Sequence, residues 1–269
     1  MMQSNPRRRP VEGGYARGQE TRLRIIRTAI PLFGRLGFES ASTREIAAEA
    51  GVNPPALQYY FDSKEGLYRA CAEYITEQAV LAMDPALVEA ERQLARAADA
   101  ANLTEAYCGI VEALADHLLC DPRASSWSPL LAREQAGLGP AIAYPMLRDR
   151  FIDRFQGVCA EIVGRITGRA ADDPQTLLRM LAINGQLVSF HIGRNGVMNM
   201  LGWSQVTPEH GELIKSVVID HARALLQAEH RAAAGRRVTA SDAPPAAAPG
   251  AAGRKGPRRA LASSVRKRP

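Results

Sequence analysis

The stretch TREIAAEAGVNPPALQYYFDSKEGLY, residues 43–68, decides the fold. It contains two short helical segments separated by Gly51, and the second segment restarts at once on Pro54. Glycine can adopt a left-handed turn that a side chain would resist, and Asn53 is a suitable N-cap for a helix that starts with proline. A small residue at 47, glycine four residues later, and apolar residues at 52 and 57 have helix-turn-helix spacing. We therefore expect the second helix to be presented to solvent.

The outward positions of that second helix carry small residues, an amide and two phenols, where a purely structural turn would expose Lys and Glu. Small residues allow close approach to a groove floor, glutamine can pair with adenine, and tyrosine hydroxyls suit phosphate contacts. Residues at the starts of the flanking helices can hold the DNA backbone. The candidate DNA contacts are Thr43, Arg44, Pro54, Pro55, Ala56, Gln58, Tyr59, Tyr60 and Lys64. Spacing alone leaves an αα corner inside a helical enzyme as the alternative.

The remainder of the chain is helical in pattern nearly throughout, and extended β-branched alternation is absent, so we predict an all-α fold. Helix starts are marked by a polar cap before proline at Asn53, Ser128, Asp173 and Thr207, and by capping-box spacing at Ser42/Glu45 and Asn102/Glu105. The predicted helices span residues 20–36, 43–50, 54–60, 63–82, 85–98, 103–120, 129–136, 140–168, 174–196 and 208–229.

The net charge of +6 on these 269 residues is concentrated at the two ends of the chain. Residues 1–19 hold four arginines and one glutamate, and residues 231–269 hold ten Lys/Arg and one Asp, which leaves −6 on residues 20–230. An acidic body with basic ends fits a nucleic-acid partner, although basic tails alone are a weak signal. The Pro/Ala/Gly-rich end has too little apolar bulk to pack. Its alternatives are a solvated tail and a segment that adds sequence-independent DNA affinity.

Several classes of protein are disfavoured by what the sequence lacks. Four widely spaced cysteines without a CxxC pair fit a reducing cytosol, and we see no signal peptide and no apolar run long enough to span a membrane. There is no GxSxG elbow, Walker loop or HExxH motif. We therefore expect a cytoplasmic protein that is not an enzyme and that uses no cofactor or metal.

Residues 20–70 resemble the DNA-binding domain of the TetR family of bacterial transcriptional regulators. The resemblance rests on LFGRLGFESASTREIAAEAGVNPPALQYYFDSKEGLYRA, and above all on Gly37-Phe38, Gly51-Val52 and the YYF-x-SKE-x-L close. It implies that the nine residues above are the DNA contacts. This chain departs from many members by having Gln58 and the pair Pro54-Pro55, so an operator sequence cannot be transferred.

Residues 131–147 and 183–203 resemble, more weakly, the effector domain of CecR-type (YbiH-like) regulators, which are associated with efflux genes and drug sensitivity. Together the resemblances imply a helix-turn-helix DNA-binding domain over 20–70 and a helical ligand-binding and dimerisation domain over 71–230. Composition predicts a flexible basic arm over 1–19, which is rich in Pro, Gly and Arg, and a disordered basic Pro/Ala-rich tail over 231–269.

Two sets of residues in the body are candidates for further functions, and ordinary core packing is the alternative for each member. Taken with the resemblance, apolar stripes on the last two helices imply a dimer interface at Leu177, Leu181, Leu187, Val188, Leu213, Val217 and Ala224. Aromatic, histidine and methionine residues suggest an apolar ligand cavity at His117, Trp127, Tyr144, Met146, Phe151, Phe155 and Met180.

The sequence therefore predicts a homodimeric repressor that binds a palindromic DNA operator and is released by a small, largely apolar effector. The alternatives are a chromatin-like protein that binds DNA without sequence preference through its basic tails, and a helical enzyme. The operator-specific repressor and the chromatin-like protein differ in how strongly DNA affinity depends on the DNA sequence.

Overall fold

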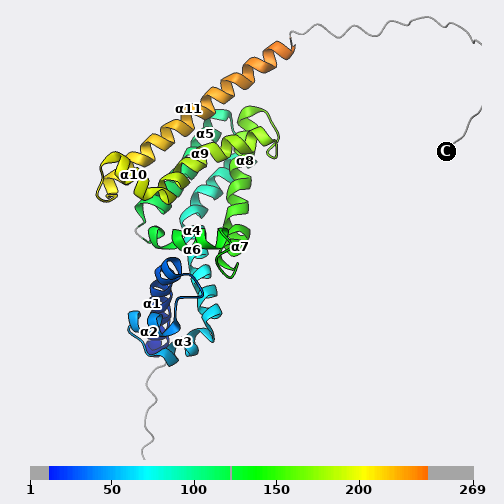
Figure 1. Cartoon of the computed structure of the whole chain (residues 1–269). Coiled ribbons are helices and arrows are strands. Elements are labelled where there is room, and N and C mark those ends of the chain that lie inside the picture. The colour runs from blue at the N-terminus through cyan, green and yellow to red at the C-terminus, as the bar shows by residue number, and fades with distance from the viewer. Residues whose placement is uncertain (1–11, 122, 242–269) are drawn as a thin grey trace, which may run out of the picture.

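The computed structural model describes residues 12–121 and 123–241, and every regular element in these ranges is a helix, as predicted (Figure 1). None of the described helices is both long and apolar enough to cross a membrane. The elements are α1 (Glu12–Leu36), α2 (Thr43–Glu49), α3 (Pro54–Phe61), α4 (Lys64–Ala95), α5 (Ala100–Ala115), the π-helical turn η1 (Asp116–Cys120), α6 (Ala124–Gln135), α7 (Ala143–Leu147), the π-helical turn η2 (Arg148–Ile152), α8 (Asp153–Thr167), α9 (Pro174–Ile192), α10 (Arg194–Leu201) and α11 (Pro208–Ser241).

A small domain at one end of the molecule consists of α1, α2, α3 and the first turns of α4 (Figure 1). Its core is built from the apolar sides of these helices, and Ile25, Phe33, Ile46 and Leu67 are among its fully buried members. The same core continues into α6 through Trp127 and Leu130. The small domain is therefore joined to the rest of the molecule by shared apolar packing as well as by α4.

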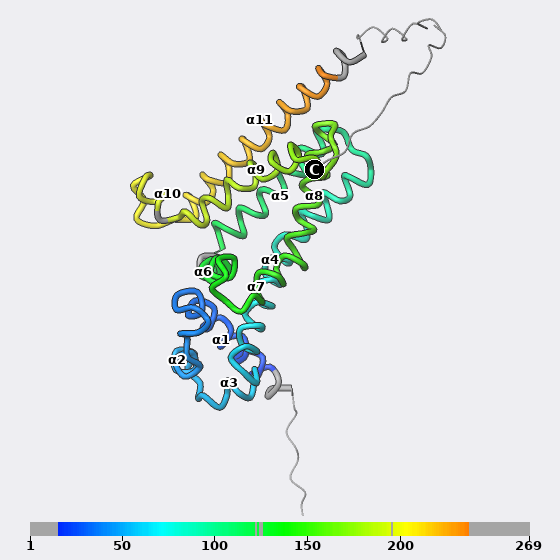
Figure 2. Tube along the Cα trace, turned by 45° about the vertical axis from the view of Figure 1, so that its right-hand side comes forward, coloured from blue at the N-terminus to red at the C-terminus, as the bar shows by residue number. Residues whose placement is uncertain are grey.

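The larger body surrounds a second core between the distal part of α4 and helices α5, α8, α9 and α11. Helices α9 and α11 lie side by side in both views, and α11 runs past the end of the body (Figures 1 and 2). Helix α6 lies between the small domain and the body (Figure 2). At 34 residues, α11 is about 50 Å long at the usual rise per residue.

Local capping explains where several helices begin. Ser42 Oγ accepts the Glu45 N–H at 3.1 Å and Asn53 Oδ1 accepts the Ala56 N–H at 3.2 Å. Asp173 likewise caps α9 through the Gln175 N–H at 2.8 Å. These side chains satisfy N–H groups that have no partner in a first helical turn, so the starts of α2, α3 and α9 agree with the sequence prediction.

The predicted starts of two helices are too late. Asp99 accepts the Asn102 N–H at 2.8 Å, so α5 begins at Ala100 and Asn102 lies inside it. Helix α6 begins at Ala124, with Pro129 inside the helix, and its N-cap residue Arg123 makes no side-chain cap hydrogen bond.

Helix α4 runs through Pro85 without the predicted break. Met83 and Leu87, on either side of the proline, are buried in the body core. Their burial offsets the hydrogen bond that a proline in a helix removes.

The two ends of the chain are more helical than predicted. Residues 12–19, expected to be a flexible arm, form the first turns of α1, and residues 231–241, expected to be disordered, form the last turns of α11. Residues 1–11 and 242–269, the rest of the expected arm and tail, lie outside the described residues.

Candidate functional site

The turn between α2 and α3 has the conformation that the sequence predicted. Gly51 has a φ of +65°, in the left-handed region that glycine tolerates best. Ile46, Ala47 and Leu57 are buried between the two helices. The inward face of the pair is thereby anchored, and the remaining face of α3 is left at the surface.

The outward face of α3 exposes the residues that were predicted to contact DNA. Pro54, Pro55, Gln58 and Tyr59 are exposed, and 81% of the Tyr59 surface is accessible. The ring of Tyr59 packs edge-on against that of Tyr60 at 5.1 Å. Ala56 and Tyr60 are half-buried. The result is a surface of small, amide and phenolic groups without a charged side chain.

Two of the predicted contacts are engaged within the protein. Gln58 Nε2 donates to the carbonyl of Asp62 at the end of α3. Lys64 Nζ donates to the Glu39 carbonyl at 3.0 Å and lies 4.7 Å from the centre of the Phe38 ring. Each side chain keeps further hydrogen-bonding groups for a nucleic acid, since the lysine ammonium has three donors and the glutamine amide has a second N–H and a carbonyl oxygen.

The remaining predicted contacts lie at the edges of this surface. Thr43, the first residue of α2, is half-buried and Arg44 is exposed. The Tyr60 hydroxyl lies next to Gly18 of α1, since a Cβ added there would be 3.8 Å away. The first turns of α1 thus support Tyr60 from behind, a contact that the prediction of a flexible arm missed.

An apolar pocket of about 100 Å³ lies between α4, α5, α6, α7 and α9 and is partly open to the surface. Its walls include Ile75, Ala79, Leu114, Leu131 and Leu147 together with four aromatic rings. The rings belong to three of the predicted cavity residues, His117, Trp127 and Phe151, and to His191, which was not predicted. A larger groove of about 430 Å³ lies between the start of α5 and α11 but is open and lined mainly by polar residues.

Four predicted cavity residues do not line this space. Phe155 stacks on Phe151 with ring centres 5.6 Å apart and belongs with Met180 to the body core. Met146 packs against the core of the small domain. The half-buried Tyr144 lies in α7, where its backbone N–H is bound by Glu134. Sequence pattern identified apolar residues correctly here but could not separate core from cavity.

The polar groups of the cavity are concentrated at one place. His191 Nδ1 is 2.9 Å from the Leu118 carbonyl, and His191 Nε2 pairs with Ser128 Oγ. His117 lies next to Trp127, with ring centres 5.5 Å apart. Burial lowers the pKa of His117 and of His191 below the usual value, so both imidazoles are neutral at pH 7.

The C-terminal half of α6 is attached to the small domain. Arg133 donates from Nε to the Gly34 carbonyl and from Nη2 to the Arg35 carbonyl, both at 2.8 Å, at the end of α1. A Cβ at Gly34 would lie 3.1 Å from Pro129 Cβ, so α1 and α6 approach as closely as glycine permits. Cations at a helix C-terminus are favourable, and Arg133 therefore fastens α6 to α1.

The neighbouring residue, Glu134, fastens α6 to two other helices. Its carboxylate accepts the N–H groups of Ile142 and Ala143 at 3.0 Å and of Tyr144 at 2.7 Å, at the start of α7. Burial and a hydrogen bond with Glu134 raise the pKa of Tyr68 in α4. The sequence analysis did not identify Arg133 and Glu134 as contacts between helices. Their hydrogen-bond partners lie 8 to 10 residues away or on other helices, and they follow no local capping rule.

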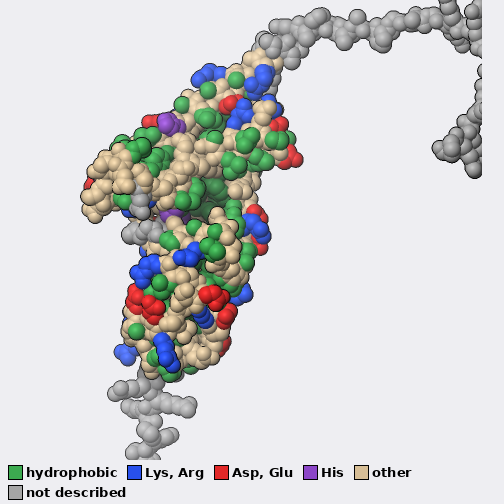
Figure 3. Space-filling view, viewed as in Figure 1, with side chains coloured by type: hydrophobic (Ala, Val, Ile, Leu, Met, Phe, Trp, Pro, Cys, Tyr) green, Lys and Arg blue, Asp and Glu red, His purple; other side chains and the backbone are tan. Residues whose placement is uncertain are grey.

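Six of the seven residues predicted for a dimer interface are exposed: Leu177, Leu181 and Val188 on α9, and Leu213, Val217 and Ala224 on α11. Spacings of four and seven residues place each set on one stripe of its helix. Figure 3 shows apolar side chains on the surface of this half of the molecule. The prediction is wrong for Leu187, which is fully buried in the body core and offers no surface to a partner.

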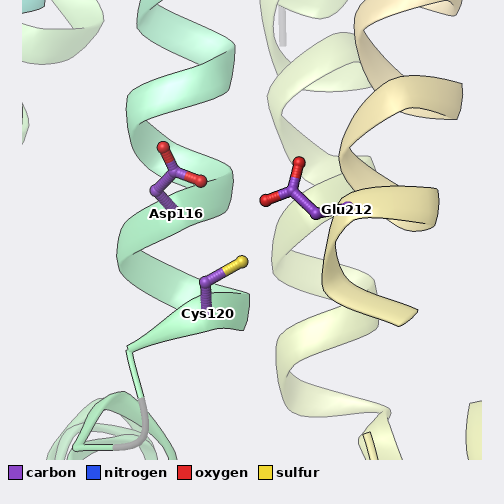
Figure 4. A group of neighbouring side chains, drawn as sticks. All are labelled: Asp116, Cys120 and Glu212. Atoms are coloured by element: carbon purple, nitrogen blue, oxygen red, sulfur yellow. The ribbon is translucent and has the colours of Figure 1, made fainter. Parts of the chain in front are cut away.

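A polar cluster links η1 to the start of α11 (Figure 4). Oxygen atoms of Asp116 and Glu212 and the sulfur of Cys120 lie within 4.8 Å of one another. The Lys215 ammonium is 2.9 Å from Asp116 Oδ1 and 2.9 Å from Glu212 Oε1. The lysine pairs with both carboxylates, so the arrangement is accounted for as an ion-pair link between the two helices.

Comparisons with known proteins agree with this architecture. Residues 25–71 match the family model of bacterial regulatory proteins, tetR family, and residues 103–229 match that of the C-terminal domain of the HTH-type transcriptional dual regulator CecR. The chain is 32% identical over 216 residues to the CecR protein of Shigella flexneri, covering 78% of this chain and 93% of that protein. It is 29% identical over 164 residues to the HTH-type transcriptional regulatory protein RaaS of Mycobacterium tuberculosis, covering 60% and 66% of the two chains.

A solved transcriptional regulator from Pseudomonas aeruginosa PAO1 has the same fold, with a TM-score of 0.53 at 20% identity, covering 79% of this chain and 94% of that one. The chain belongs to the TetR family of bacterial transcriptional regulators and is related to CecR over most of its length.

Proposed function

We propose that this regulator is a homodimeric repressor that binds a palindromic operator in the cytoplasm and is released from it by a small, largely apolar effector. The observation that carries the proposal is the outward face of α3. Tyr59 and Gln58 are exposed there on a helix whose inner side is buried. Such a face has no packing role in the monomer and suits the floor of a major groove.

The proposed contacts divide into base-reading and backbone-positioning groups. Gln58 would read a base through its amide, and the carbons of Pro54 and Ala56 would meet a thymine methyl. Lys64 and Arg44 would hold phosphates. Pro55 removes a backbone donor that other helix starts could offer, so this operator is expected to differ from those of relatives with other residues here.

Dimerisation would bury the exposed stripes of α9 and α11 against their copies in a two-fold four-helix arrangement. Leu181 is 51% exposed and Leu213 is 54% exposed, which is costly for leucines that remain in water. One α3 contacts too few base pairs for specific binding. Two copies about 34–36 Å apart would read an inverted repeat.

Helix α6 offers a route from the cavity to the DNA-binding domain. Its Trp127, Ser128 and Leu131 line the cavity, and Arg133, less than two turns further on, holds the end of α1. An effector between α6 and the body would favour a different position of α6. The position of α1, and with it the spacing of the two α3 helices, would then shift away from the one that fits DNA.

The test of this function is selection of bound sequences from a pool of random duplexes by the purified full chain. Recovery of an inverted repeat, with half-site centres one helical turn or a multiple of it apart, supports the proposal. Recovery of sequences without a shared motif contradicts it and favours DNA binding without sequence preference.

A further inference from the structure

We infer that Tyr74 of α4 is a positioning residue for DNA recognition: its hydroxyl group joins α1 to the start of α6 and thereby fixes the direction of α1. This inference rests on the proposed function, in which sequence-specific binding depends on how the two α3 helices are held. It is carried by two arginines that meet at this hydroxyl, by the place of Tyr74 between the two cores, and by the second attachment of α1 at Arg133.

The Tyr74 hydroxyl accepts hydrogen bonds from two arginines that belong to different parts of the fold. Arg27 Nε of α1 donates to it at 3.1 Å, and Arg123 Nη1, at the start of α6, donates at 3.4 Å. A hydroxyl has two acceptor lone pairs, so it can accept both bonds at once. Tyr74 is buried, and the Arg27 guanidinium also lies over its ring, 5.7 Å from the ring centre. The hydroxyl therefore connects α1, α4 and α6 at one point.

Arg123 is oriented toward Tyr74 by three other groups. Its Nη2 pairs with Asp121 Oδ2 at 2.8 Å, and its Nη1 also donates to Gln78 Oε1 at 2.9 Å. Its guanidinium carbon lies 5.8 Å from the centre of the Trp127 ring, and that ring packs edge-on against Tyr74. Since Gln78 lies about one turn after Tyr74 on the same helix, the start of α6 is fixed to this part of α4.

Tyr74 lies where the two apolar cores of the molecule meet. Tyr74 and Ile75 belong to the core of the small domain, and Ala79, about one turn later, belongs to the body core. The hydrophobic effect is non-directional, whereas a hydrogen bond weakens steeply when its angle changes. The bonds at the Tyr74 hydroxyl therefore set the angle between the two parts more sharply than apolar burial alone.

Helix α1 has polar attachments at two places along its length. Arg27 bonds to Tyr74 near its middle, and Arg133 holds its last turn. These places are about 10–12 Å apart along the helix at the usual rise per residue. One attachment would leave α1 able to pivot, whereas two define the direction of its axis. Because α1 and α3 share the core of the small domain, a change in the direction of α1 moves α3.

The experiment compares the affinity of the full chain for its selected operator with that for a scrambled duplex of the same length, by fluorescence anisotropy. In Tyr74→Phe, which removes only the hydroxyl oxygen, we expect the ratio of the two affinities to fall at least tenfold. The affinity for the scrambled duplex should change less than twofold, because binding to phosphates without sequence preference requires no fixed spacing of two α3 helices.

The matched control is Tyr107→Phe, which removes another buried hydroxyl. Tyr107 lies in the body core, where its hydroxyl donates to Asn184 Oδ1 at 3.0 Å. Loss of that bond should change the ratio less than twofold, although it removes the same chemical group.

A double-mutant cycle tests whether Arg27 acts through Tyr74. Arg27→Met should lower the ratio at least fivefold in the wild-type chain but less than twofold in Tyr74→Phe. Additive effects would overturn the inference. So would an unchanged or increased ratio in Tyr74→Phe, an equal loss of affinity for both duplexes, or an equal fall in Tyr107→Phe, and each of these outcomes leaves the proposed function in place. A wild-type chain without preference for any duplex would defeat the proposed function together with the inference.

Discussion

At the scale of single residues, hydrogen bonds within the protein orient two of the side chains on and beside the outward face of α3. The Gln58 amide is bound by the Asp62 carbonyl and the Lys64 ammonium by the Glu39 carbonyl. Each keeps further donors, or an acceptor oxygen in Gln58, that DNA can bind. A base edge does so only where its sequence is right, whereas a phosphate does so everywhere.

Gln58→Ala is therefore expected to relax base preference at one position of each half-site, at a cost of about 1–3 kcal/mol on the preferred sequence. Lys64→Ala and Tyr60→Phe should weaken binding to all duplexes alike, and Lys64→Ala should also reduce the salt dependence. Anisotropy titrations on a set of single-base operator variants measure both effects. Arg148→Ala, an exposed charge change in the body, is the control, and unchanged affinity in all three variants would refute the assignment of α3.

The buried histidines of the cavity should make the stability of the protein depend on pH. Burial lowers the pKa of His117 and His191 in the folded chain. As the pH falls below about 6.5, the unfolded chain takes up protons that the folded chain resists, so the free energy of unfolding decreases. Urea midpoints between pH 7.5 and 5.0 should fall less steeply in His117→Gln and His191→Gln than in the exposed control His230→Gln. Identical slopes in all three would contradict this cause.

At the scale of elements, local capping determined how much of the fold could be predicted. Asn53 and Asp173 cap their helices as their sequence positions indicate, and the α2–α3 turn follows directly from Gly51. The starts of α5 and α6 could not be found this way, because Asp99 competes with Asn102 as the cap of α5, and α6 begins without a side-chain cap.

In the candidate site, too, some features follow from local sequence and others depend on how distant helices pack. The outward residues of α3 could be read from helical spacing, since a short helix with one buried side has only one exposed face. The cavity could not, because whether Phe155 or Phe151 borders empty space depends on how helices from distant parts of the chain pack. The His191 and Arg133 contacts join residues 63 to 99 positions apart, a distance at which sequence carries no local signal.

The attachment of α6 to α1 is expected to carry the coupling between effector and DNA. Arg133→Met removes both hydrogen bonds to the end of α1 and should lower stability by about 1–3 kcal/mol. It should also reduce the effect of a ligand on operator affinity, while the affinity of the cavity for that ligand stays the same. Ligand titrations with and without operator DNA measure the coupling. Arg133→Lys, which keeps the charge but loses the two-bond geometry, should be intermediate, and full coupling in Arg133→Met would rule out this route.

At the scale of the whole molecule, the exposed stripes of α9 and α11 are the surface best suited to a second copy of the chain. Leu181→Glu/Val217→Glu should give a monomer, because charges would be buried without partners in the interface. Operator affinity should fall at least a hundredfold, since one α3 alone remains on the DNA. Sedimentation equilibrium and anisotropy measure the two effects. Leu81→Glu, at a more exposed leucine on α4, is the control; a double variant that remains dimeric would exclude this interface.

The central claim is that the chain recognises a specific DNA sequence through α3 as a dimer. The most direct test is fluorescence anisotropy on duplexes tiled across the DNA upstream of the gene, with a scrambled control, at two salt concentrations. We predict that one tile containing an inverted repeat binds at least a hundredfold more tightly than the others at near-physiological salt. Equal binding of all tiles, abolished by added salt, would contradict the claim and leave the basic ends of the chain as the source of DNA affinity.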